Sequence, residues 1–379
     1  MRFAFNEEQD ALRAAARSFL GDHSSSEHVR RAMQSELGYE PAVWRRIGTE
    51  LGWPSIIIPE QYGGAGLTYV ELIALMEEMG RALLCAPFFS SVCLAANALL
   101  VGGDEAQKAA HLPGIAAGET IATLALTEPS GRWDATGIET IARRDGSDFI
   151  LSGTKTFVPD GHTADLLVVA ARRVDTRGTS GVSVFLVPAD APGLERRLLP
   201  TMDQTRKQAE VVLRDVRVPA TALMGAEGDG WDILQRTLDL AAVALAAEQV
   251  GGAERCLEMS VDYAKERVQF GRPIGSFQAI KHKCADMLLQ VESARSAAYY
   301  AGWAAAVDDP ELPALASLAK AYCSDAFFFC AAESIQIHGG VGFTWEYEVH
   351  LYFKRAKSSE TLLGPADYHR ERIAQAIGL

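Results

Sequence analysis

The spacing of hydrophobic and polar positions changes twice along the chain. Up to residue 120, apolar residues recur at intervals typical of helices, and Asn6, ahead of two glutamates, is a plausible helix cap. Between residues 121 and 226, short β-branched runs bounded by Gly, Pro or Asp predict strands of an antiparallel sheet or barrel. From residue 227 to 379, long Ala- and Leu-containing segments again predict helices.

This succession of helices, strands and helices predicts an α+β protein with three domains, at 1–120, 121–226 and 227–379. Separate helical and strand zones argue against a doubly wound α/β fold, in which the two alternate. No Gly-x-Gly-x-x-Gly segment follows a predicted strand, and no glycine-rich loop ends in Lys-Ser or Lys-Thr. The sequence therefore favours neither a Rossmann domain nor a P-loop.

Charge and hydrophobicity narrow the class of protein. The 379 residues include 36 basic and 49 acidic side chains, which gives a net charge of −13. Nucleic acid is not an expected partner, because binding to it depends on Lys and Arg that neutralise phosphates. A hydrophobic content of 48% with 22% charged residues is ordinary for a folded soluble protein.

Targeting signals and metal sites are not expected. The first ten residues carry acids where a signal peptide needs a basic region and an apolar run. The most apolar stretches are 238–247, which is too short to span a bilayer, and 314–332, which contains Lys320 and Asp325. The six cysteines show no Cys-x-x-Cys spacing, so free thiols in a reducing compartment are predicted. We therefore expect a cytoplasmic protein without a membrane span or a zinc site.

Four segments and one loop carry chemical information. They are LALTEPSGRWD (124–134), ERVQFGRPIGSFQAIKHKCADM (266–287), QIHGGVGFTWE (336–346), HLYFKRAKSSETLLG (350–364) and the loop PEQYGGAGL (59–67). Taken singly, each segment has an ordinary interpretation as a turn, a helix end or a solvated basic face. Together, in this order and on this layout, they resemble the acyl-CoA dehydrogenase family over essentially the whole chain.

The resemblance implies a fold, a cofactor and a reaction. The fold would be an N-terminal helical domain, a middle antiparallel β-barrel and a C-terminal four-helix bundle. The cofactor would be FAD, held without a Rossmann domain in a dimer of dimers. The reaction would be α,β-dehydrogenation of an acyl-CoA thioester, in which a carboxylate removes the α-proton and the β-hydrogen leaves as hydride. An electron-accepting flavoprotein would be a further partner.

The diphosphate end of the cofactor site matches the family. By resemblance, a guanidinium and an amide hold the diphosphate, an aromatic ring packs near the adenosine, and two glycines let backbone N–H groups approach an anion across the dimer interface. The matching residues are Arg267, Phe270, Gln278, Gln336, Gly339 and Gly340. The alternative is purely structural, with Arg267 as a helix cap and Gly339-Gly340 as the end of a helix.

The position of the catalytic base differs from the family pattern. The usual glutamate would fall at Leu363, and leucine cannot take a proton. In some relatives the glutamate lies on the first helix of the C-terminal domain, and that position is Ala241, with Ala242 in place of a neighbouring arginine. No catalytic residue is therefore assigned.

Two further motifs are changed around the flavin ring. Thr127 and Phe157 remain and would flank the isoalloxazine. In the family pattern TEPxAGSD, this chain has Trp133 in place of the serine and Arg132 in place of the glycine before it. Pro159 replaces a hydroxyl that usually bonds the flavin, and proline also lacks an N–H.

Other acids are weak candidates for the base. We expect Glu248 to serve packing or a polar network and Glu360 to pair with Arg355 or Lys357. Asp239 would point to another face of its helix than the blank site. By resemblance, His338 belongs to the interface.

Three functions are compatible with an intact diphosphate end and an altered reactive end. In the first, the chain is the base-less subunit of an α2β2 acyl-CoA dehydrogenase heterotetramer, acting in fatty acid or sterol degradation, and a homologous subunit supplies the glutamate. In the second, it is a homo-oligomeric flavin monooxygenase- or oxidase-like relative. In the third, it is a structural subunit without flavin, which the matches at Arg267, Phe270 and Gln278 disfavour.

Overall fold

The computed structural model describes residues 5–379, and these divide into two compact units. One unit combines the chain up to residue 31 with residues 69–84 and 242–379, and the other combines residues 32–68 and 85–241. The predicted boundaries at 120 and 226 remain predictions, because each unit is assembled from separate stretches of chain.

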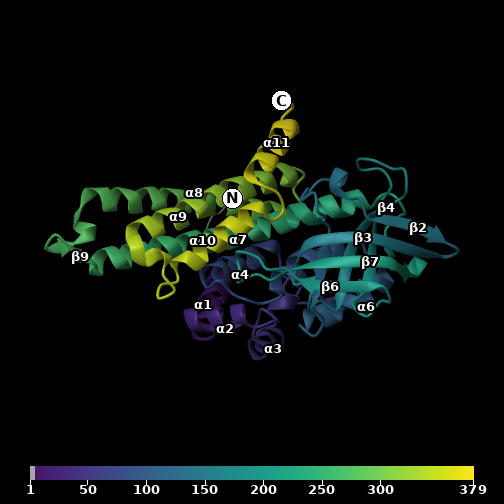
Figure 1. The fold of residues 1–379 in the computed structure, drawn as a ribbon, viewed down its shortest axis with the longest axis horizontal. Coiled ribbons are helices and arrows are strands. Elements are labelled where there is room, and N and C mark those ends of the chain that lie inside the picture. The colour runs from purple at the N-terminus through teal and green to yellow at the C-terminus, as the bar shows by residue number, and fades with distance from the viewer. Residues whose placement is uncertain (1–4) are drawn as a thin grey trace. The chain divides into compact units, whose positions relative to one another are not determined.

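The first unit is helical (Figure 1). Helix α1 begins with a reciprocal capping box, in which the Asn6 side chain accepts from the Gln9 N–H and the Gln9 side chain accepts from the Asn6 N–H. The cap predicted at Asn6 is thus confirmed. The helices that lie wholly in this unit are α1 (Glu7–His23), α4 (Tyr69–Arg81), α8 (Gln278–Ala306), α9 (Leu312–His338), α10 (Val349–Thr361) and α11 (Ala366–Ala376).

Two helices run from one unit into the other. They are α2 (Ser26–Gln34) and the long α7 (Gly230–Glu266). Within the first unit, α4 and α7 meet at glycines: a Cβ on Gly80 would lie 1.9 Å from the Glu248 carbonyl oxygen, and one on Gly251 would lie 1.8 Å from that of Glu77. Only glycine permits so close a backbone approach. This crossing fixes the part of α7 that carries Glu248.

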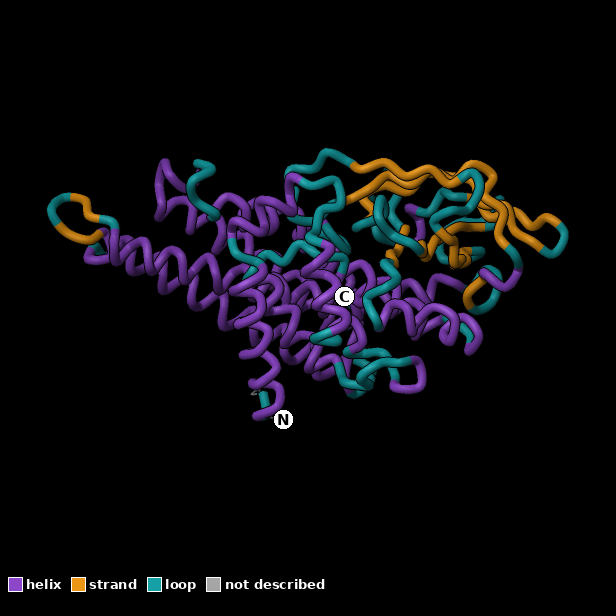
Figure 2. Tube along the Cα trace, turned by 90° about the horizontal axis from the view of Figure 1, so that it is seen from below, coloured by secondary structure: helices purple, strands orange, loops and turns teal. Residues whose placement is uncertain are grey.

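A short hairpin separates α7 from α8. It consists of β9 (Val268–Gln269) and β10 (Arg272–Pro273), and it extends beyond the ends of the two helices (Figure 2). The hairpin turn contains Phe270 and Gly271, both at positive φ. Two residues predicted to bind the cofactor, Arg267 and Phe270, therefore lie at or next to this hairpin.

The second unit contains the main sheet. Its strands are β1 (Ala122–Ala125), β2 (Ile141–Asp145), β3 (Asp148–Pro159), β4 (Leu166–Arg172), β5 (Val182–Pro188), β6 (Leu194–Leu198), β7 (Gln208–Val218) and β8 (Leu223–Met224). The order is β6-β7-β3-β2-β4-β5-β8, and β1 pairs with β4. Alternate residues such as Phe149, Leu151 and Phe185 are fully buried in its core.

The prediction of a closed antiparallel barrel is wrong. The sheet is open, with β6 and β8 at its two ends, and β4 pairs in parallel with both β1 and β2. Strand β2 pairs along its whole length with β3, and only Ile141 pairs with Arg172 of β4. The sequence pattern could identify these strands but not their order, because a short β-branched run does not show which strands are neighbours.

Helices α3 (Pro41–Thr49), α5 (Asn97–Gly102) and α6 (Glu105–Ala116) complete the second unit, with a π-helical segment at Phe89–Ala96. The fold thus has the predicted helical N-terminal region, sheet-containing middle and helical C-terminal region. None of the described helices is both long enough and apolar enough to pass through a bilayer.

Candidate cofactor and active site

The hairpin end of the first unit presents a cation and an aromatic ring. The Arg267 N–H donates to the Tyr263 carbonyl at 2.8 Å and ends α7. Its guanidinium is exposed and forms no ion pair within residues 5–379. Phe270 is 93% exposed and has a φ of +53°, a costly conformation for an aromatic residue. Gln278, the first residue of α8, is also exposed.

The end of α9 offers open backbone. Gln336 is exposed, and a Cβ built on Gly339 or Gly340 would have no neighbouring atom within 4 Å. The preceding His338 is buried, bonds the Ser334 carbonyl oxygen through Nδ1 at 2.7 Å and stacks on Tyr263 at 4.3 Å. Burial lowers the pKa of His338. This histidine therefore joins α9 to α7, and the glycines after it leave backbone exposed to a ligand.

These residues fit an anionic diphosphate. An exposed guanidinium without a carboxylate partner can donate bidentate hydrogen bonds to phosphate. Open backbone at two glycines allows N–H groups to approach an anion. Arg267 and Phe270 lie in the α7–α8 connection and Gln278 begins α8, whereas Gln336, Gly339 and Gly340 lie at the end of α9.

Thr127 and Phe157 lie together in the second unit. The Thr127 hydroxyl donates to the Thr156 carbonyl oxygen at 2.6 Å, and the Thr156 N–H donates to the Thr127 carbonyl oxygen at 2.9 Å. Phe157 follows in β3, at a bulge opposite β7, with a φ of +53° and 47% of its surface exposed. The bulge turns the ring away from the sheet core. The backbone thus presents Phe157 as a half-exposed flat surface beside a fixed Thr127.

A buried ion pair lies next to Thr127 and Phe157 in the sequence. Lys155 Nζ lies 2.6 Å from Glu128 Oε1, and the two side chains are 0% and 4% exposed. The Glu128 carboxylate also accepts the N–H groups of Glu139 and Thr140 at 2.9 Å. Burial lowers the pKa of Lys155 to about 8, against the opposing charge of Glu128. Burial alone would raise the pKa of Glu128, but the Lys155 charge and the hydrogen bonds outweigh it and the pKa is lowered.

The two positions of a family base hold buried aliphatic side chains. Leu363 is 3% exposed and has a φ of +63°, and Gly364 follows with a φ of +102°. Ala241 and Ala242 on α7 are 0% and 1% exposed. None of these side chains can exchange a proton.

The substitute acids considered from the sequence are engaged elsewhere. Glu248 forms an ion pair with Arg355 at 2.8 Å, and the two side chains are 5% and 2% exposed. Glu360 pairs with Lys357 at 2.9 Å, as the sequence predicted. The Asp239 carboxylate accepts a hydrogen bond from Gln235 one turn earlier on α7, at 3.3 Å.

The changed TEPSGRWD segment is held by local polar contacts. Arg132 pairs with Asp134 at 2.9 Å, and Asp134 also accepts the N–H of Thr136. Trp133 is half-buried. Pro159, which replaces a hydroxyl in the family pattern, supplies its carbonyl oxygen to the Thr123 hydroxyl at 2.6 Å.

Sequence reasoning missed a cavity of about 500 Å³ beside the sheet, between residues 136–141 and 172–178. The buried Arg172 guanidinium donates to four carbonyl oxygens around it, those of Ala135, Ile138, Thr176 and Gly178. Arg173 and Arg177 also line the cavity and form no ion pair in the described part of the chain. Glu139 and Asp175 line the same cavity, so its lining carries both charges, and we assign no anion site to it.

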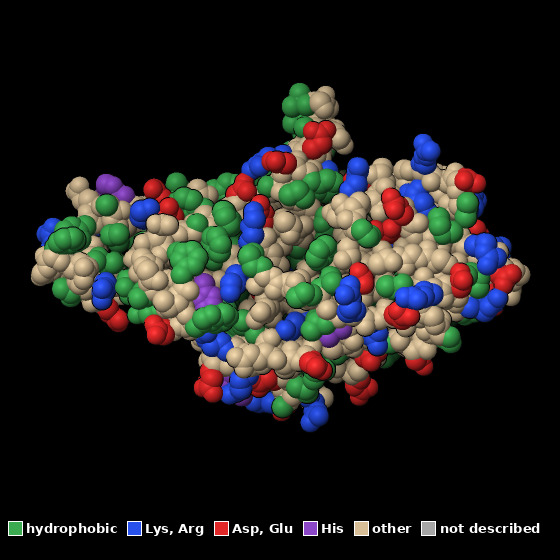
Figure 3. Space-filling model, in the orientation of Figure 1, with side chains coloured by type: hydrophobic (Ala, Val, Ile, Leu, Met, Phe, Trp, Pro, Cys, Tyr) green, Lys and Arg blue, Asp and Glu red, His purple; other side chains and the backbone are tan. Residues whose placement is uncertain are grey.

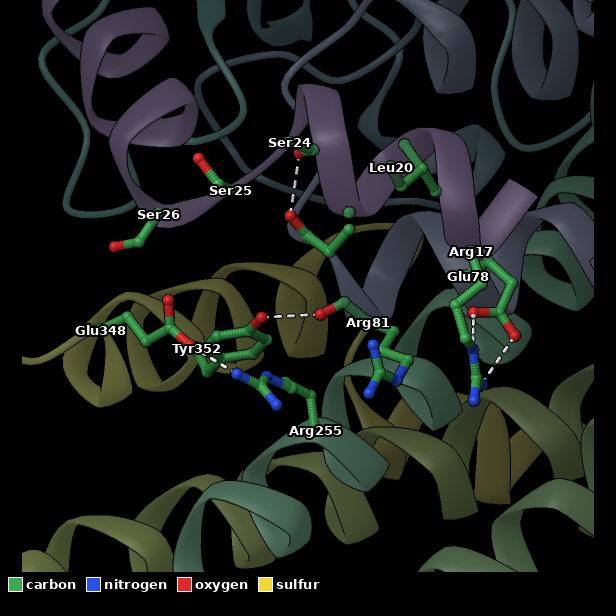
Figure 4. Close-up of a pocket in the computed structure, with 12 residues that line it drawn as sticks. Arg17, Leu20, Ser24, Ser25, Ser26, Glu78, Arg81, Arg255, Glu348 and Tyr352 are labelled. Carbon is green, nitrogen blue, oxygen red and sulfur yellow. Dashed lines mark hydrogen bonds and ion pairs between the residues drawn. The ribbon is translucent and has the colours of Figure 1, made fainter. Parts of the chain in front are cut away.

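A second cavity, of about 280 Å³, lies within the first unit (Figure 4). Its three arginines each face a carboxylate: Arg17 meets Glu78 at 2.8 Å, Arg81 meets Glu258 at 2.5 Å, and Arg255 meets Glu348 at 3.1 Å. The Tyr352 hydroxyl donates to the Arg81 carbonyl oxygen at 2.6 Å. Because each of its arginines is paired with a carboxylate, we assign no anion site to this cavity. Its polar side chains connect α1, α4, α7 and α10.

Comparison with known proteins identifies the family. The sequence matches the N-terminal domain of acyl-CoA dehydrogenases over residues 6–119, the middle domain over 123–216 and the C-terminal domain over 228–378. The chain belongs to the acyl-CoA dehydrogenase family. Members of this family are FAD-dependent oxidoreductases that act on the CH–CH group of acyl-CoA, which confirms the predicted family, cofactor and reaction class.

Individual relatives align over nearly the full length. Acyl-CoA dehydrogenase IpdE2 of Mycolicibacterium smegmatis is 34% identical, covering 98% of this chain and 99% of the relative. The solved structure of butyryl-CoA dehydrogenase from Megasphaera elsdenii superposes with a TM-score of 0.93 at 30% identity, covering 100% of both chains. A chain of the ChsE4-ChsE5 complex from Mycobacterium tuberculosis superposes with a TM-score of 0.90 at 29% identity, covering 100% of this chain and 99% of that one.

Proposed function

We propose that this chain is the base-less subunit of a heteromeric FAD-dependent acyl-CoA dehydrogenase. The observation that carries the proposal is the state of the base positions: Leu363 and Ala241 are buried aliphatic residues, and the Glu248 carboxylate is neutralised by Arg355. A dehydrogenase without a carboxylate at the substrate α-carbon lacks its proton acceptor, and a general base contributes about 10²- to 10⁴-fold to the rate. A homologous partner chain would supply that carboxylate in an α2β2 assembly.

The chain's own residues would serve the cofactor. FAD, when bound, supplies the two-electron oxidation of the acyl group. Arg267 and Gln278 would hold its diphosphate, and Phe270 would pack near the adenosine. Gln336, Gly339 and Gly340 would complete a cofactor site across the subunit interface. Thr127 and Phe157 would flank the isoalloxazine of a cofactor bound in this chain.

Exposed apolar side chains support a partner subunit. Large hydrophobic side chains on α8, α9 and the segment after α9 are exposed, and Figure 3 shows hydrophobic side chains over this helical region. The residues are Leu288, Leu289, Tyr322, Phe329, Phe343 and Trp345. Exposed large apolar side chains on neighbouring elements are compatible with a subunit interface. A related chain is part of the ChsE4-ChsE5 complex, whose name joins two different proteins.

The acyl group and the electron acceptor are further parts of this proposal. Fatty acyl-CoA and sterol side-chain CoA thioesters are the two substrate classes that we propose for the assembly, and a flavoprotein would accept its electrons. Turnover of one class with the complete heteromer, and none with this chain alone, is the expected result. Turnover by this chain alone would contradict the assignment of the base to a partner.

Replacing Arg267 with alanine is expected to weaken flavin retention by the assembled complex. A charge-assisted hydrogen bond contributes about 1.5–3 kcal/mol, so the FAD dissociation constant should rise by roughly 10- to 100-fold. Flavin absorbance before and after dialysis measures this change. Arg272→Ala is the matched control, because Arg272 is a nearby exposed arginine whose guanidinium stacks on Phe277 at 4.2 Å. Equal flavin retention by both variants would contradict the role of Arg267.

A further inference from the structure

A fully buried lysine lies beneath the turn between α10 and α11. Lys320 of α9 is 0% exposed. Its Nζ donates to the Ser324 hydroxyl at 2.8 Å, to the Glu360 carbonyl oxygen at 3.1 Å and to the Gly364 carbonyl oxygen at 3.1 Å. All three acceptors are neutral oxygens. Within residues 5–379, Lys320 has no carboxylate partner.

The charged groups around Lys320 are committed to other partners. On α10, the Glu360 carboxylate pairs with Lys357. On α9 itself, Asp325 pairs with Arg370 of α11, and Cys323 is a buried thiol. On α11, His369 is buried and Arg372 adds a second positive charge nearby. On α7, Glu248 pairs with Arg355, and the side chain next to Ser324 is the neutral amide of Gln249.

The turn above Lys320 has an unfavourable backbone conformation. Leu363 and Gly364 both have positive φ, and a leucine in this region costs about 1 kcal/mol or more. The Leu363 carbonyl oxygen lies 3.0 Å from His369 Nε2. Burial and the neighbouring Lys320 lower the pKa of His369 to about 3, so its ring is neutral and its Nε2–H donates to Leu363. Lys320 and His369 together bind three carbonyl oxygens, those of residues 360, 363 and 364.

We propose that Lys320 is a positioning residue that holds the turn at residues 361–365, and with it the side chain at position 363, in this left-handed conformation. Because position 363 is where the family base would stand, its relevance to catalysis rests on the proposed function. The side chain at this position is leucine, which cannot take a proton.

The support works in both protonation states of Lys320. A charged Nζ has three hydrogens and satisfies all three oxygens. A neutral Nζ has two hydrogens, enough for the two carbonyl oxygens of the turn, and its lone pair can accept from the Ser324 hydroxyl. In that state the Gln249 amide, 3.0 Å from Ser324 Oγ, still donates to the Ser324 oxygen. Loss of the proton therefore reverses one hydroxyl hydrogen bond without releasing the turn.

The pH dependence of stability follows from this arrangement. Burial lowers the pKa of Lys320 to about 7. The unfolded chain then binds more protons than the folded chain above that pH, so the contribution of Lys320 to stability rises between about pH 7 and pH 10. Protonation below this window carries the full cost of a buried charge without a counter-ion.

Lys320→Met tests the proposal on the full chain, without flavin, substrate or partner, so its outcome is independent of the proposed dehydrogenase function. We expect amide hydrogen exchange at Leu362 and Gly364 to accelerate by about tenfold or more, with other amides of α10 and α11 much less affected. The pH-dependent rise in stability should be smaller in the variant than in the wild type. Lys265→Met, at a side chain that is 71% exposed on α7, is the control and should change neither quantity.

Two outcomes would overturn the proposal. The first is unchanged exchange at Leu362 and Gly364 in Lys320→Met, or a uniform acceleration over the whole chain. The second applies even if that variant does not fold. Ser324→Ala removes an acceptor that only charged Lys320 needs, so its stability loss relative to wild type should be larger at pH 6.5 than at pH 9.5. A loss independent of pH would show that Ser324 is not an acceptor of the Lys320 ammonium, and would contradict the hydrogen bonding on which the proposal rests.

Discussion

Replacing Glu128 with alanine is expected to destabilise the protein by about 3–5 kcal/mol, because it leaves the fully buried Lys155 ammonium without its counter-ion. The N–H groups of Glu139 and Thr140 would lose their acceptor at the same time. The free energy of unfolding from urea titrations measures the loss. Glu195→Ala, which breaks an exposed pair with Arg214, is the control and should cost less than about 1 kcal/mol.

The pH dependence of this variant gives a second check. Lys155 keeps a pKa of about 8 only with the support of the Glu128 charge. Without Glu128, its pKa should fall further, and raising the pH should relieve part of the destabilisation because the buried amine can then be neutral. A loss that stays constant between pH 7 and pH 9.5 would show that Lys155 is not the cause. Recovery in the double variant Glu128→Leu/Lys155→Met would support the pair as the cause.

Introducing a glutamate at position 363 is not expected to give this chain acyl-CoA dehydrogenase activity. Leu363→Glu would place a carboxylate at a site where the present side chain is 3% exposed, so burial would raise the pKa of the new group. Pro159 and Trp133 would remain changed, and Ala242 would still lack a cation. We expect turnover of acyl-CoA by this chain alone to stay within about tenfold of background, whereas a working general base supplies about 10²- to 10⁴-fold.

The same substitution can be tested inside the heteromer. The partner's base would first be removed by changing its catalytic glutamate to glutamine, and Leu363→Glu would then be added to this chain. The expected result is that activity does not return. Recovery to more than about a hundredth of the original rate would show that the reactive end of this chain is intact apart from one side chain. Leu362→Glu in the same background is the matched control for an added acid in this turn.

The helical regions and their order could be predicted from the sequence, but the strand order of the sheet could not. Short β-branched runs bounded by Gly, Pro or Asp identified strands such as Leu166–Arg172. They could not show that this strand pairs in parallel with two others, because pairing depends on contacts distant in sequence. The closed barrel was an expectation from resemblance, and the open edges at β6 and β8 correct it.

The diphosphate end was accessible to sequence reasoning because its residues lie within short motifs. Arg267, Phe270 and Gln278 span one segment, and their exposure in the structure is compatible with the role assigned to them. The ion-pair partner of a buried acid could not be predicted from a short motif. The sequence predicted a packing or network role for Glu248 but not its partner Arg355, which lies more than a hundred residues later. The burial of Lys320 was also hidden, because nothing in the sequence distinguishes a buried lysine of a helix from an exposed one.

The flavin content of the assembled protein tests the central claim most directly. This chain would be co-expressed with a candidate homologous acyl-CoA dehydrogenase chain from the same organism and co-purified through a tag on one chain. The product would be assayed for flavin and for both chains. We predict a stable complex of the two chains with about half a flavin per chain, because Trp133 and Pro159 change the flavin-ring end of this chain's own site. A homo-oligomer of this chain with about one flavin per chain would contradict the heteromeric account.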